Sequence, residues 1–429
     1  MPLKVDLRLL NNSFAALNKT RTMTLRANAA LTALMVAFIG LAQTGVKAQQ
    51  AFVLCEGAQD FYSGEVLESP RLGTFQWDAE EPSFEVLHVF EGHSFAVDCI
   101  LDEAGEEVFV SAEDTVYRMN ALTGEILAQQ ALEGARKLLL TDDQLLVTRG
   151  DYDPVTFGSV AFDQFLVSLD RTDLSWQAGW EAGSGDGPAF ASESMAVVNG
   201  VVYVAINNAF AYGQEVGLMG RLDLVSGEYS ELDLGPEGLN PVHLFATDEG
   251  VVSVNARQYE STSLSSVDSG SEVSTLVVAE TTAGCGAAAI MDDEVVFQVY
   301  GEGDFRKADA NVLTAGENWP GNGLSAYSMC VVPGFVMLGG TDFASTGSID
   351  VMDMNGELLS SLSTGIAPGK IVASPQTSSV SNAMGIPSEV KVETGRFDLL
   401  GRPCATGHSG LQVVRFLDGT AETVFRLAD

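Results

Sequence analysis

Two of the four histidines, His93 and His243, stand in predicted loops near acidic residues, and they are the first candidates for chemistry. An imidazole beside a carboxylate such as Asp98 or Glu193 could bind a metal ion or exchange protons. The sequence contains no HExxH motif, no paired CxxC motif and no EF-hand loop. The alternative interpretation is that each ring only satisfies a structural hydrogen bond. The residues therefore predict no catalytic or metal-binding site, with His93 and His243 kept as candidates.

A larger set of aromatic, basic and polar residues also falls in predicted loops, where folding does not require large apolar side chains. Such a set favours a surface that stacks on a ligand and hydrogen-bonds to it. The alternative is that these side chains pack over the ends of strands. The predicted ligand-binding face comprises His93, Arg136, Lys137, Glu193, Asn208, Phe210, Tyr212, His243, Arg257, Tyr259, Tyr300, Arg306, Tyr327, Phe343 and Lys370.

The elements that position these loops are β-hairpins, and residues 195–234 show the pattern best. Asn199-Gly200 separates two β-branched runs, which is the strongest short signal for a hairpin because both residues accept the positive φ of a type I′ turn. Ser226-Gly227 separates two further apolar runs. Two successive hairpins form a four-stranded meander, which needs neighbours of its own kind to bury both faces.

The meander recurs about every 40 to 50 residues, with six inner hairpins and seven outer hairpins along the chain. Seven outer and six inner hairpins fit a ring in which one blade is shared by the two ends, 370–374 pairing with 51–55. The sequence therefore predicts an all-β fold, a seven-bladed β-propeller of four-stranded antiparallel blades over residues 49–373. A β-sandwich with additional strands is the alternative. In a propeller, the loops carrying the predicted binding residues gather on one face around the axis.

The charge of the chain is strongly negative, with 22 basic and 58 acidic residues and a formal net charge of -36. This balance opposes binding to phosphate backbones and anionic membrane surfaces, so we predict no nucleic-acid partner. The acidity could serve solubility, adapt the surface to saline surroundings or bind cations, and Ca²⁺ is the one cation ligand considered. No other cofactor is predicted. The glycine-rich stretch 183–187 has no helix behind it, which argues against a phosphate site.

The N-terminal region has the pattern of a secretory signal peptide. Arg26 precedes an apolar run over 29–42, and small residues follow up to Ala48, so we predict residues 1–48 as the signal, with Met23 as an alternative start. The apolar run is too short for a transmembrane helix, and no transmembrane span is predicted. Five cysteines are too few for a disulfide scaffold, although export permits bridges, for which Cys55 would be the useful partner.

The C-terminal region begins with a Ser/Thr-rich linker, 374–385, and continues as a small β-patterned module, 386–429. This module resembles the C-terminal sorting domain of type IX secretion cargo in Bacteroidota, although Gln412 replaces the usual aromatic residue. A last hairpin of the main domain is the alternative. The residues that carry the resemblance are Asp398, Leu399, Leu400, Gly401, Arg402, Gly410, Arg415, Asp418 and Gly419. The resemblance implies the type IX secretion machinery as a partner and a secreted or outer-membrane cell-surface location, reached through the periplasm.

Residues 51–373 resemble the YncE-like, YVTN-type seven-bladed propellers of Bacteroidota surfaces. The resemblance is carried by the repeat pattern and by Leu54-Cys55-Glu56-Gly57, in which Cys55 replaces the usual Asn. Members of this family include surface binding proteins, some of which bind cobalamin, and others of unknown role. The sequence thus predicts an exported propeller that binds a small molecule, a glycan or a protein. Two alternatives remain, namely a lactonase-like hydrolase or lyase using His93 and His243, and a structural or adhesion component.

Overall fold

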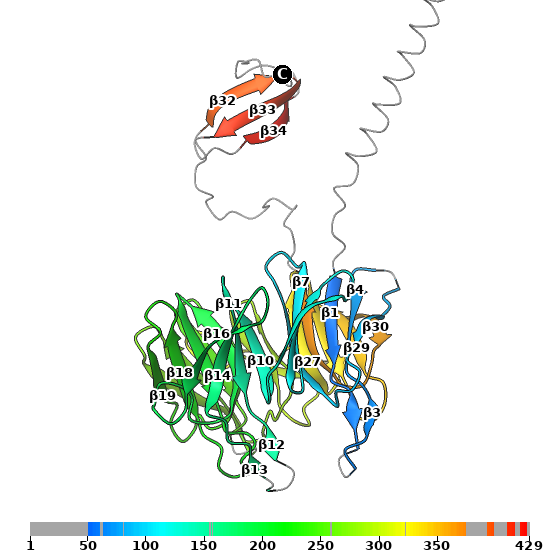
Figure 1. Ribbon diagram of the computed structural model, residues 1–429. Helices are drawn as coiled ribbons and strands as arrows, with labels where there is room; N and C mark the ends of the chain where they lie inside the picture. The colour runs from blue at the N-terminus through cyan, green and yellow to red at the C-terminus, as the bar shows by residue number, and fades with distance from the viewer. Residues whose placement is uncertain are drawn as a thin grey trace, which may run out of the picture. The chain divides into compact units, whose positions relative to one another are not determined.

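The computed structural model describes residues 50–60, 63–79, 81–153, 156, 158–257, 260–321 and 323–374, and the backbone of 393–398, 410–416 and 421–426. The chain forms two units, Met1–Gln376 and Thr377–Asp429. All the regular elements described are β-strands (Figure 1), and none of the described residues forms a helix able to cross a membrane. The predicted signal peptide and, apart from Ser374, the predicted linker lie outside the described residues.

The first unit is a seven-bladed β-propeller, as the repeat pattern predicts, and each blade is an antiparallel sheet. The strands of each blade follow chain order from the axis outward, except in blade 1. Blade 1 consists of β31 (Pro368–Ala373), β1 (Gln50–Cys55), β4 (Arg71–Gln76) and β5 (Glu85–Val89). Blade 2 consists of β6 (Ala96–Leu101), β7 (Glu107–Ala112), β8 (Thr115–Asn120) and β9 (Ile126–Ala131). Blade 3 consists of β10 (Ala135–Leu140), β11 (Gln144–Arg149), β14 (Gln164–Asp170) and β15 (Trp176–Glu181).

The remaining blades continue this order. Blade 4 consists of β16 (Ser192–Val198), β17 (Val201–Ile206), β18 (Leu218–Asp223) and β19 (Tyr229–Asp233). Blade 5 consists of β20 (Pro241–Ala246), β21 (Gly250–Asn255), β22 (Thr262–Asp268) and β23 (Val273–Ala279). Blade 6 has β24 (Ala288–Met291), β25 (Glu294–Gln298) and β26 (Phe305–Asp309), and the bridges of Ala315 and Trp319 to β26 occupy its fourth position. Blade 7 consists of β27 (Ala326–Val332), β28 (Phe335–Gly340), β29 (Ser348–Asp353) and β30 (Leu358–Ser363).

The two ends of the propeller close the ring in blade 1. β31 pairs antiparallel with β1, with Ala51 opposite Ala373 and Val53 opposite Ile371, and the backbone N–H of Ser374 donates to the carbonyl of Gln50 at 2.8 Å. The shared blade predicted from the hairpin count is confirmed. Each innermost strand contacts the innermost strands of the neighbouring blades, and β31 contacts β27 and β6. The seven innermost strands therefore form a continuous wall around the axis.

Seven apolar clusters hold the blades together, one between each pair of neighbours. In the cluster between blades 7 and 1, Val53 and Trp77 pack with Met337 and Val351. The outermost strands are mostly exposed, whereas second strands such as β17 are buried on both faces, since a neighbouring blade covers each one. The apolar core thus lies between the blades, where side chains of neighbouring sheets interdigitate, and not on the axis of the ring.

The turns follow the chemistry expected from the sequence. In the inner hairpin of blade 4, Asn199 and Gly200 have φ of 51° and 80°, as a type I′ turn requires. In the outer hairpins an Asp or Asn ends the third strand and accepts bonds from the next turn: Asp223 Oδ1 accepts from the N–H groups of Val225 and Ser226, both at 2.8 Å. Such Asx turns recur at Asn120, Asp170, Asp309 and Asp353.

The two faces of the ring differ. One face carries the inner hairpin turns and both ends of the propeller, near Gln50 and Ser374. The other carries the loops that enter the innermost strands and two small hairpins, β2–β3 (Ala58–Gln59, Val66–Glu68) and β12–β13 (Tyr152–Asp153, Gly158–Ser159), visible at the lower edge in Figure 1. We call the second face the loop face, and it bears the residues predicted to bind a ligand.

The second unit contains a three-stranded antiparallel sheet of β32 (Glu393–Asp398), β33 (Gly410–Phe416) and β34 (Ala421–Arg426). Asp398, Gly410 and Arg415 of the predicted sorting motif belong to these strands. Leu399, Leu400, Gly401, Arg402, Asp418 and Gly419 lie outside the described residues. The β-patterned module thus forms a sheet of its own, while its role in export stays a prediction.

Candidate functional site

A cavity of about 770 Å³ occupies the axis of the propeller, and residues of all seven innermost strands line it. The loop-face residues that line it include Glu56, Arg136, Glu193 and Tyr327. Its volume lies within the range of about 300–1,000 Å³ that is usual for small-molecule sites. The axial cavity is therefore the candidate functional site.

Irregularities at the start of the innermost strands direct side chains into this cavity. In β6, β10, β16, β20 and β27 the pairing register with the second strand shifts near the first residues, and it shifts at the same place between β31 and β1. Every residue skipped by these shifts lines the cavity: Val97, Arg136, Lys137, Glu193, Ser194, Val242, Tyr327 and Gly369. Bulges re-aim side chains in this way beside binding sites. These shifts thus deliver one or two side chains to the axis from each of blades 2, 3, 4, 5 and 7.

Arg136 and Glu193 form an ion pair between blades 3 and 4. The Glu193 side chain is only 7% exposed, so its carboxylate depends on this partner. The Arg136 guanidinium also stacks over the Phe210 ring at 4.7 Å from the centroid, a cation–π contact that fixes its orientation. Phe210, predicted to face a ligand, lies against Arg136 and outside the residues that line the cavity.

A second ion pair joins blades 1 and 2 across the cavity, because Lys370 Nζ lies 3.2 Å from Asp98 Oδ1. The Asp98 carboxylate is nearly fully buried and raises the pKa of Lys370. Asp98 Oδ2 also accepts from the backbone N–H of Leu138 in blade 3, at 3.0 Å. Lys370 thereby neutralises a buried acid, which limits its availability to a ligand.

Lys137 differs from the other two cations of the cavity. Its ammonium donates to the carbonyl of Val97 at 3.3 Å and belongs to none of the ion pairs formed by the described residues. It acts electrostatically on Glu56 of blade 1 and His243 of blade 5, which places its charge near the axis. Lys137 is therefore the cation of the cavity whose charge is least neutralised by a neighbouring carboxylate.

Glu56 and Tyr327 form a hydrogen-bonded pair in which the Tyr327 hydroxyl lies 2.9 Å from both carboxylate oxygens. Burial raises the pKa of Glu56 from 4.5 to about 6. The hydrogen bond from Tyr327 and the positive charges of Lys137 and Arg136 act in the opposite direction and lower this pKa, but by less. Burial and the nearby carboxylate also raise the pKa of Tyr327. A Cβ on Gly369 would come within 2.1 Å of Glu56 Oε1, so glycine is required there for the carboxylate to keep this position.

The two candidate catalytic histidines occupy different surroundings. His243 lines the cavity, but its Nε2 bonds the carbonyl of Gly286 at 2.8 Å, and burial lowers its pKa from 6.5 to about 4. His93 does not line the cavity, and its Nε2 lies 2.6 Å from the Tyr117 hydroxyl while Nδ1 lies 3.5 Å from Glu113. Because the two rings do not share a cavity, they do not form a joint acid–base or metal site.

Of the predicted binding residues, Arg136, Lys137, Glu193, His243, Tyr327 and Lys370 line the cavity. Others have local structural partners: Asn208 Nδ2 donates to the carbonyl of Gln214, Arg257 pairs with Glu237, and Arg306 pairs with Glu302. The Phe343 ring packs edge-on against Tyr327, 4.9 Å between centroids. Tyr212 and Tyr300 are 84% and 77% exposed, and Tyr259 lies outside the described residues.

The cavity residues that were not predicted for the binding face include Glu56, Asp98 and Cys285. Asp98 is the third residue of β6, as Lys137 is of β10, so its place in the repeat carried the signal. Glu56 directly follows β1, the second strand of blade 1, and so lies outside the segments that enter the innermost strands. All four described cysteines are free, and Cys285 is exposed, whereas Cys55 and Cys99 are buried.

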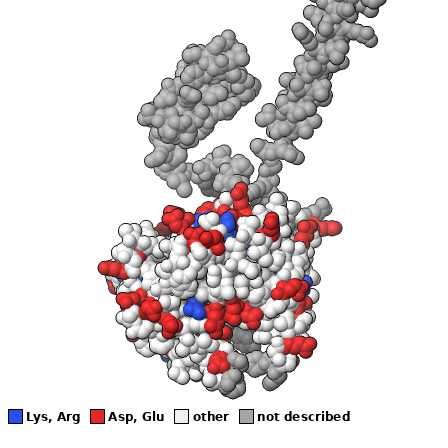
Figure 2. Space-filling view, viewed as in Figure 1, with Lys and Arg blue, Asp and Glu red and all other residues white. Residues whose placement is uncertain are grey.

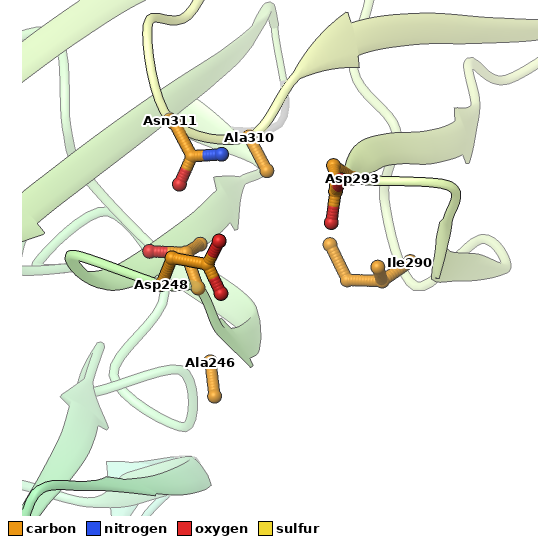
Figure 3. Close-up of a pocket in the computed structure, with 7 residues that line it drawn as sticks. Ala246, Asp248, Ile290, Asp293, Ala310 and Asn311 are labelled. Carbon is orange, nitrogen blue, oxygen red and sulfur yellow. The ribbon is translucent and has the colours of Figure 1, made fainter. Parts of the chain in front are cut away.

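A smaller cavity of about 250 Å³ lies on the opposite face, between the inner turns of blades 5 and 6. Figure 3 shows Asp248 and Asn311 on one side of it and Asp293 near Ile290 on the other. No group of three or more His, Cys, Asp or Glu residues within the described part of the chain is arranged to hold a metal ion. Binding of Ca²⁺, considered from the sequence, stays a prediction.

The balance of charge in the axial cavity differs from that of the surface. Figure 2 shows Asp and Glu side chains over much of the visible surface and few Lys and Arg side chains. The chain as a whole has 22 basic and 58 acidic residues, whereas the cavity is lined by equal numbers of each. Arg136, Lys137 and Lys370 face Glu56, Asp98 and Glu193 there. Cations are thus concentrated at the axis relative to the rest of the protein.

These features define a class of protein, a seven-bladed β-propeller with a polar cavity on its axis. No protein family matches the sequence, and no curated protein is similar to it. A functionally unknown protein from Desulfotomaculum acetoxidans DSM 771 has a similar structure, with a TM-score of 0.52 and 13% identity over 76% of this chain and 98% of that chain. The computationally designed Ika8 protein matches 77% of this chain and 96% of its own, with 14% identity and a TM-score of 0.41. At 13% identity, the first similarity supports the fold alone.

Proposed function

We propose that this protein is an exported propeller that binds a ligand in the axial cavity without transforming it. The observation that carries the proposal is the cavity of about 770 Å³, into which the strand irregularities of five blades direct their side chains. A polar lining without a shared acid–base pair suits binding and release. The YncE-like resemblance supports the same conclusion, since its members include surface binding proteins.

A small molecule or a short glycan segment is the favoured ligand. The cavity is enclosed by the innermost strands, so a folded protein partner would reach only its rim. Hydrolase or lyase activity has no specific support, because His93 and His243 do not share a cavity. A structural or adhesion component would need no ligand in the cavity, and this distinguishes it from the proposed binding protein.

A thermal-shift screen of the full chain against corrinoids, glycans and divalent ions tests the proposal. A ligand at about one hundred times its dissociation constant stabilises the folded state by about 2.7 kcal/mol, which raises the unfolding temperature by several degrees. Ser194 lines the cavity, so a Ser194→Trp variant should fill it and abolish the shift. Ser230 lies exposed on the outermost strand of the same blade, and Ser230→Trp is the matched control that should keep the shift.

The outcomes separate the three functions. Stabilisation that survives Ser194→Trp would place the ligand outside the cavity and contradict the proposed site. The absence of any stabilising compound would favour the structural or adhesion component. Turnover of a lactone or sugar substrate that is lost in His93→Ala or His243→Ala would favour the hydrolase or lyase.

Export by type IX secretion to the cell surface forms a separate part of the proposal. It is supported by the signal-peptide pattern of 1–48 and the sorting-domain resemblance of 386–429. Deletion of 386–429 should leave the protein in the periplasm, detected by fractionation and by protease protection of intact cells. Normal surface delivery of this deletion would show that the module is not the sorting signal.

A further inference from the structure

The lining of the axial cavity changes from charged to apolar along the axis. All seven innermost strands begin at the loop face, so early residues lie near the loops and late residues lie near the inner turns. Charged groups occupy early positions, including Lys137 and Lys370. Late positions are apolar, and Ile100, Leu139, Phe245, Ile290 and Val331 all line the cavity. A strand rises about 3.3 Å per residue, so Leu139 lies roughly 7 Å deeper along the axis than Lys137, two residues before it.

The charged groups near the loop face are not equally available. Arg136 is paired with Glu193, and Lys370 with Asp98, so each of these cations already neutralises an acid. The Lys137 ammonium donates to the backbone carbonyl of Val97 and forms none of the ion pairs of the described residues. An incoming anion would therefore gain most from the Lys137 ammonium, without breaking an existing ion pair.

We propose that the axial cavity binds a small amphipathic anion, with its anionic head on Lys137 and its apolar tail along Ile100, Leu139 and Phe245. This inference rests on the proposed function and specifies its ligand class. The tail would gain about 0.8 kcal/mol for each CH₂ group buried. The Lys137 charge discriminates by sign, because a cationic head would face it at close range.

Glu56 adds a pH dependence to this site. The groups that face it are the Tyr327 hydroxyl of blade 7, the charges of Arg136 and Lys137 from blade 3, and the Cys285 thiol between blades 5 and 6. Ionised Glu56 repels an anionic head, whereas protonated Glu56 does not. Because the pKa of Glu56 is raised to about 6, anion affinity should increase as the pH falls from 7.5 to 5.5.

Isothermal titration calorimetry of the full chain with four probes tests the inference. The probes are 1-decanesulfonate, which stays ionised across this pH range, decyltrimethylammonium and decanol with the same tail, and methanesulfonate with the head alone. We expect 1-decanesulfonate to bind at least tenfold more tightly than the other three. Lys137→Met should weaken its binding about tenfold, which corresponds to about 1.4 kcal/mol. Lys307→Met is the matched control, because Lys307 pairs with Glu294 and does not line the cavity.

The pH arm and the blocking variant complete the test. The gain in 1-decanesulfonate affinity at pH 5.5 should disappear in Glu56→Gln, where the carboxamide is neutral at both values. Equal affinity for the anionic and cationic probes, unchanged binding in Lys137→Met, or binding that persists in Ser194→Trp would each overturn the inference. If a compound from the thermal-shift screen requires an open cavity while 1-decanesulfonate does not bind, the inference fails and the proposed function stands.

Discussion

Replacement of Glu56 by glutamine should stabilise the protein at neutral pH, although it removes a charge from a hydrogen-bonded pair. The glutamine side chain is close to that of glutamate in shape, and its carbonyl oxygen can still accept from the Tyr327 hydroxyl that lies 2.9 Å from the carboxylate. Burial raises the pKa of Glu56 from 4.5 to about 6 despite this bond, so the folded protein disfavours the ionised form. The substitution removes that unfavourable ionisation.

The size and pH range of the effect follow from linkage. A carboxyl group whose pKa is raised on folding binds its proton more tightly in the folded state, so its contribution to stability falls as the pH rises from 4.5 to 6. Each pKa unit corresponds to about 1.4 kcal/mol, and some solvent screening remains around this partly exposed group, which gives a cost of about 1–2 kcal/mol above pH 7. Below about pH 4 the cost is absent, because the carboxyl is protonated in both states.

Urea denaturation followed by tryptophan fluorescence between pH 4 and pH 8 measures this cost as a difference in the free energy of unfolding. Glu56→Gln should exceed the wild type by about 1–2 kcal/mol at pH 8 and match it at pH 4. Glu228→Gln, in an exposed outer turn, should give no pH-dependent difference and controls for the loss of one negative charge from an acidic protein. A Glu56→Gln variant that is less stable at pH 8, or a difference that is constant with pH, would refute the reasoning.

Three further predictions concern the scaffold. Gly250→Ala should destabilise the propeller by about 1–3 kcal/mol in urea denaturation, because a Cβ there would lie 2.0 Å from the carbonyl oxygen of Val267, whereas Gly183→Ala, with open space around it, should change stability little. NMR titration should find the His243 ring neutral down to about pH 5, because burial lowers its pKa to about 4. The stability that this neutral ring contributes should be complete above pH 6.5 and should be lost as the pH falls through 4. A His243 ring that titrates near pH 6.5 would contradict its burial. Truncation after Gln376 should keep the unfolding temperature of the first unit, whereas truncation before β31 should lower it by about 10 °C or more, because the ring then opens.

The sequence predicted the fold well because propeller repeats depend on local turn chemistry. Asn199-Gly200 adopts the two positive φ angles of its predicted turn, and Asp223 accepts the two turn bonds that its position implies. The closing pair of β31 and β1 followed from counting hairpins. Blade 6 departed from the pattern, because only Ala315 and Trp319 bridge to the third strand at its outer edge. The turn after Asp309 still forms, with the N–H of Asp309 donating to the carbonyl of Thr314 at 2.9 Å, so the turn residues gave no sign of this difference.

The site was predicted in part, because the position of a residue in the repeat indicates which way its side chain points but not which residues it pairs with. Arg136, Lys137 and Lys370 were identified from the segments that enter the innermost strands, and all three line the cavity. Arg306 was predicted for the same face, yet it pairs with Glu302 four residues earlier. Glu56 was missed because its partner, Tyr327, lies 271 residues away in sequence. Contacts made through ring closure leave no local pattern in a single sequence.

The claim that the axial cavity is the binding site can be tested most directly through Cys285, which lines the cavity and is exposed. Alkylation of Cys285 by iodoacetamide in the full chain is followed by peptide mass spectrometry, with an added cysteine peptide as the reference. The best stabiliser from the thermal-shift screen, and 1-decanesulfonate in parallel, are added to saturation. If the ligand occupies the cavity, alkylation of Cys285 slows at least tenfold while that of the reference peptide is unchanged. An unchanged rate for Cys285 at saturation would contradict the assignment of the axial cavity as the site.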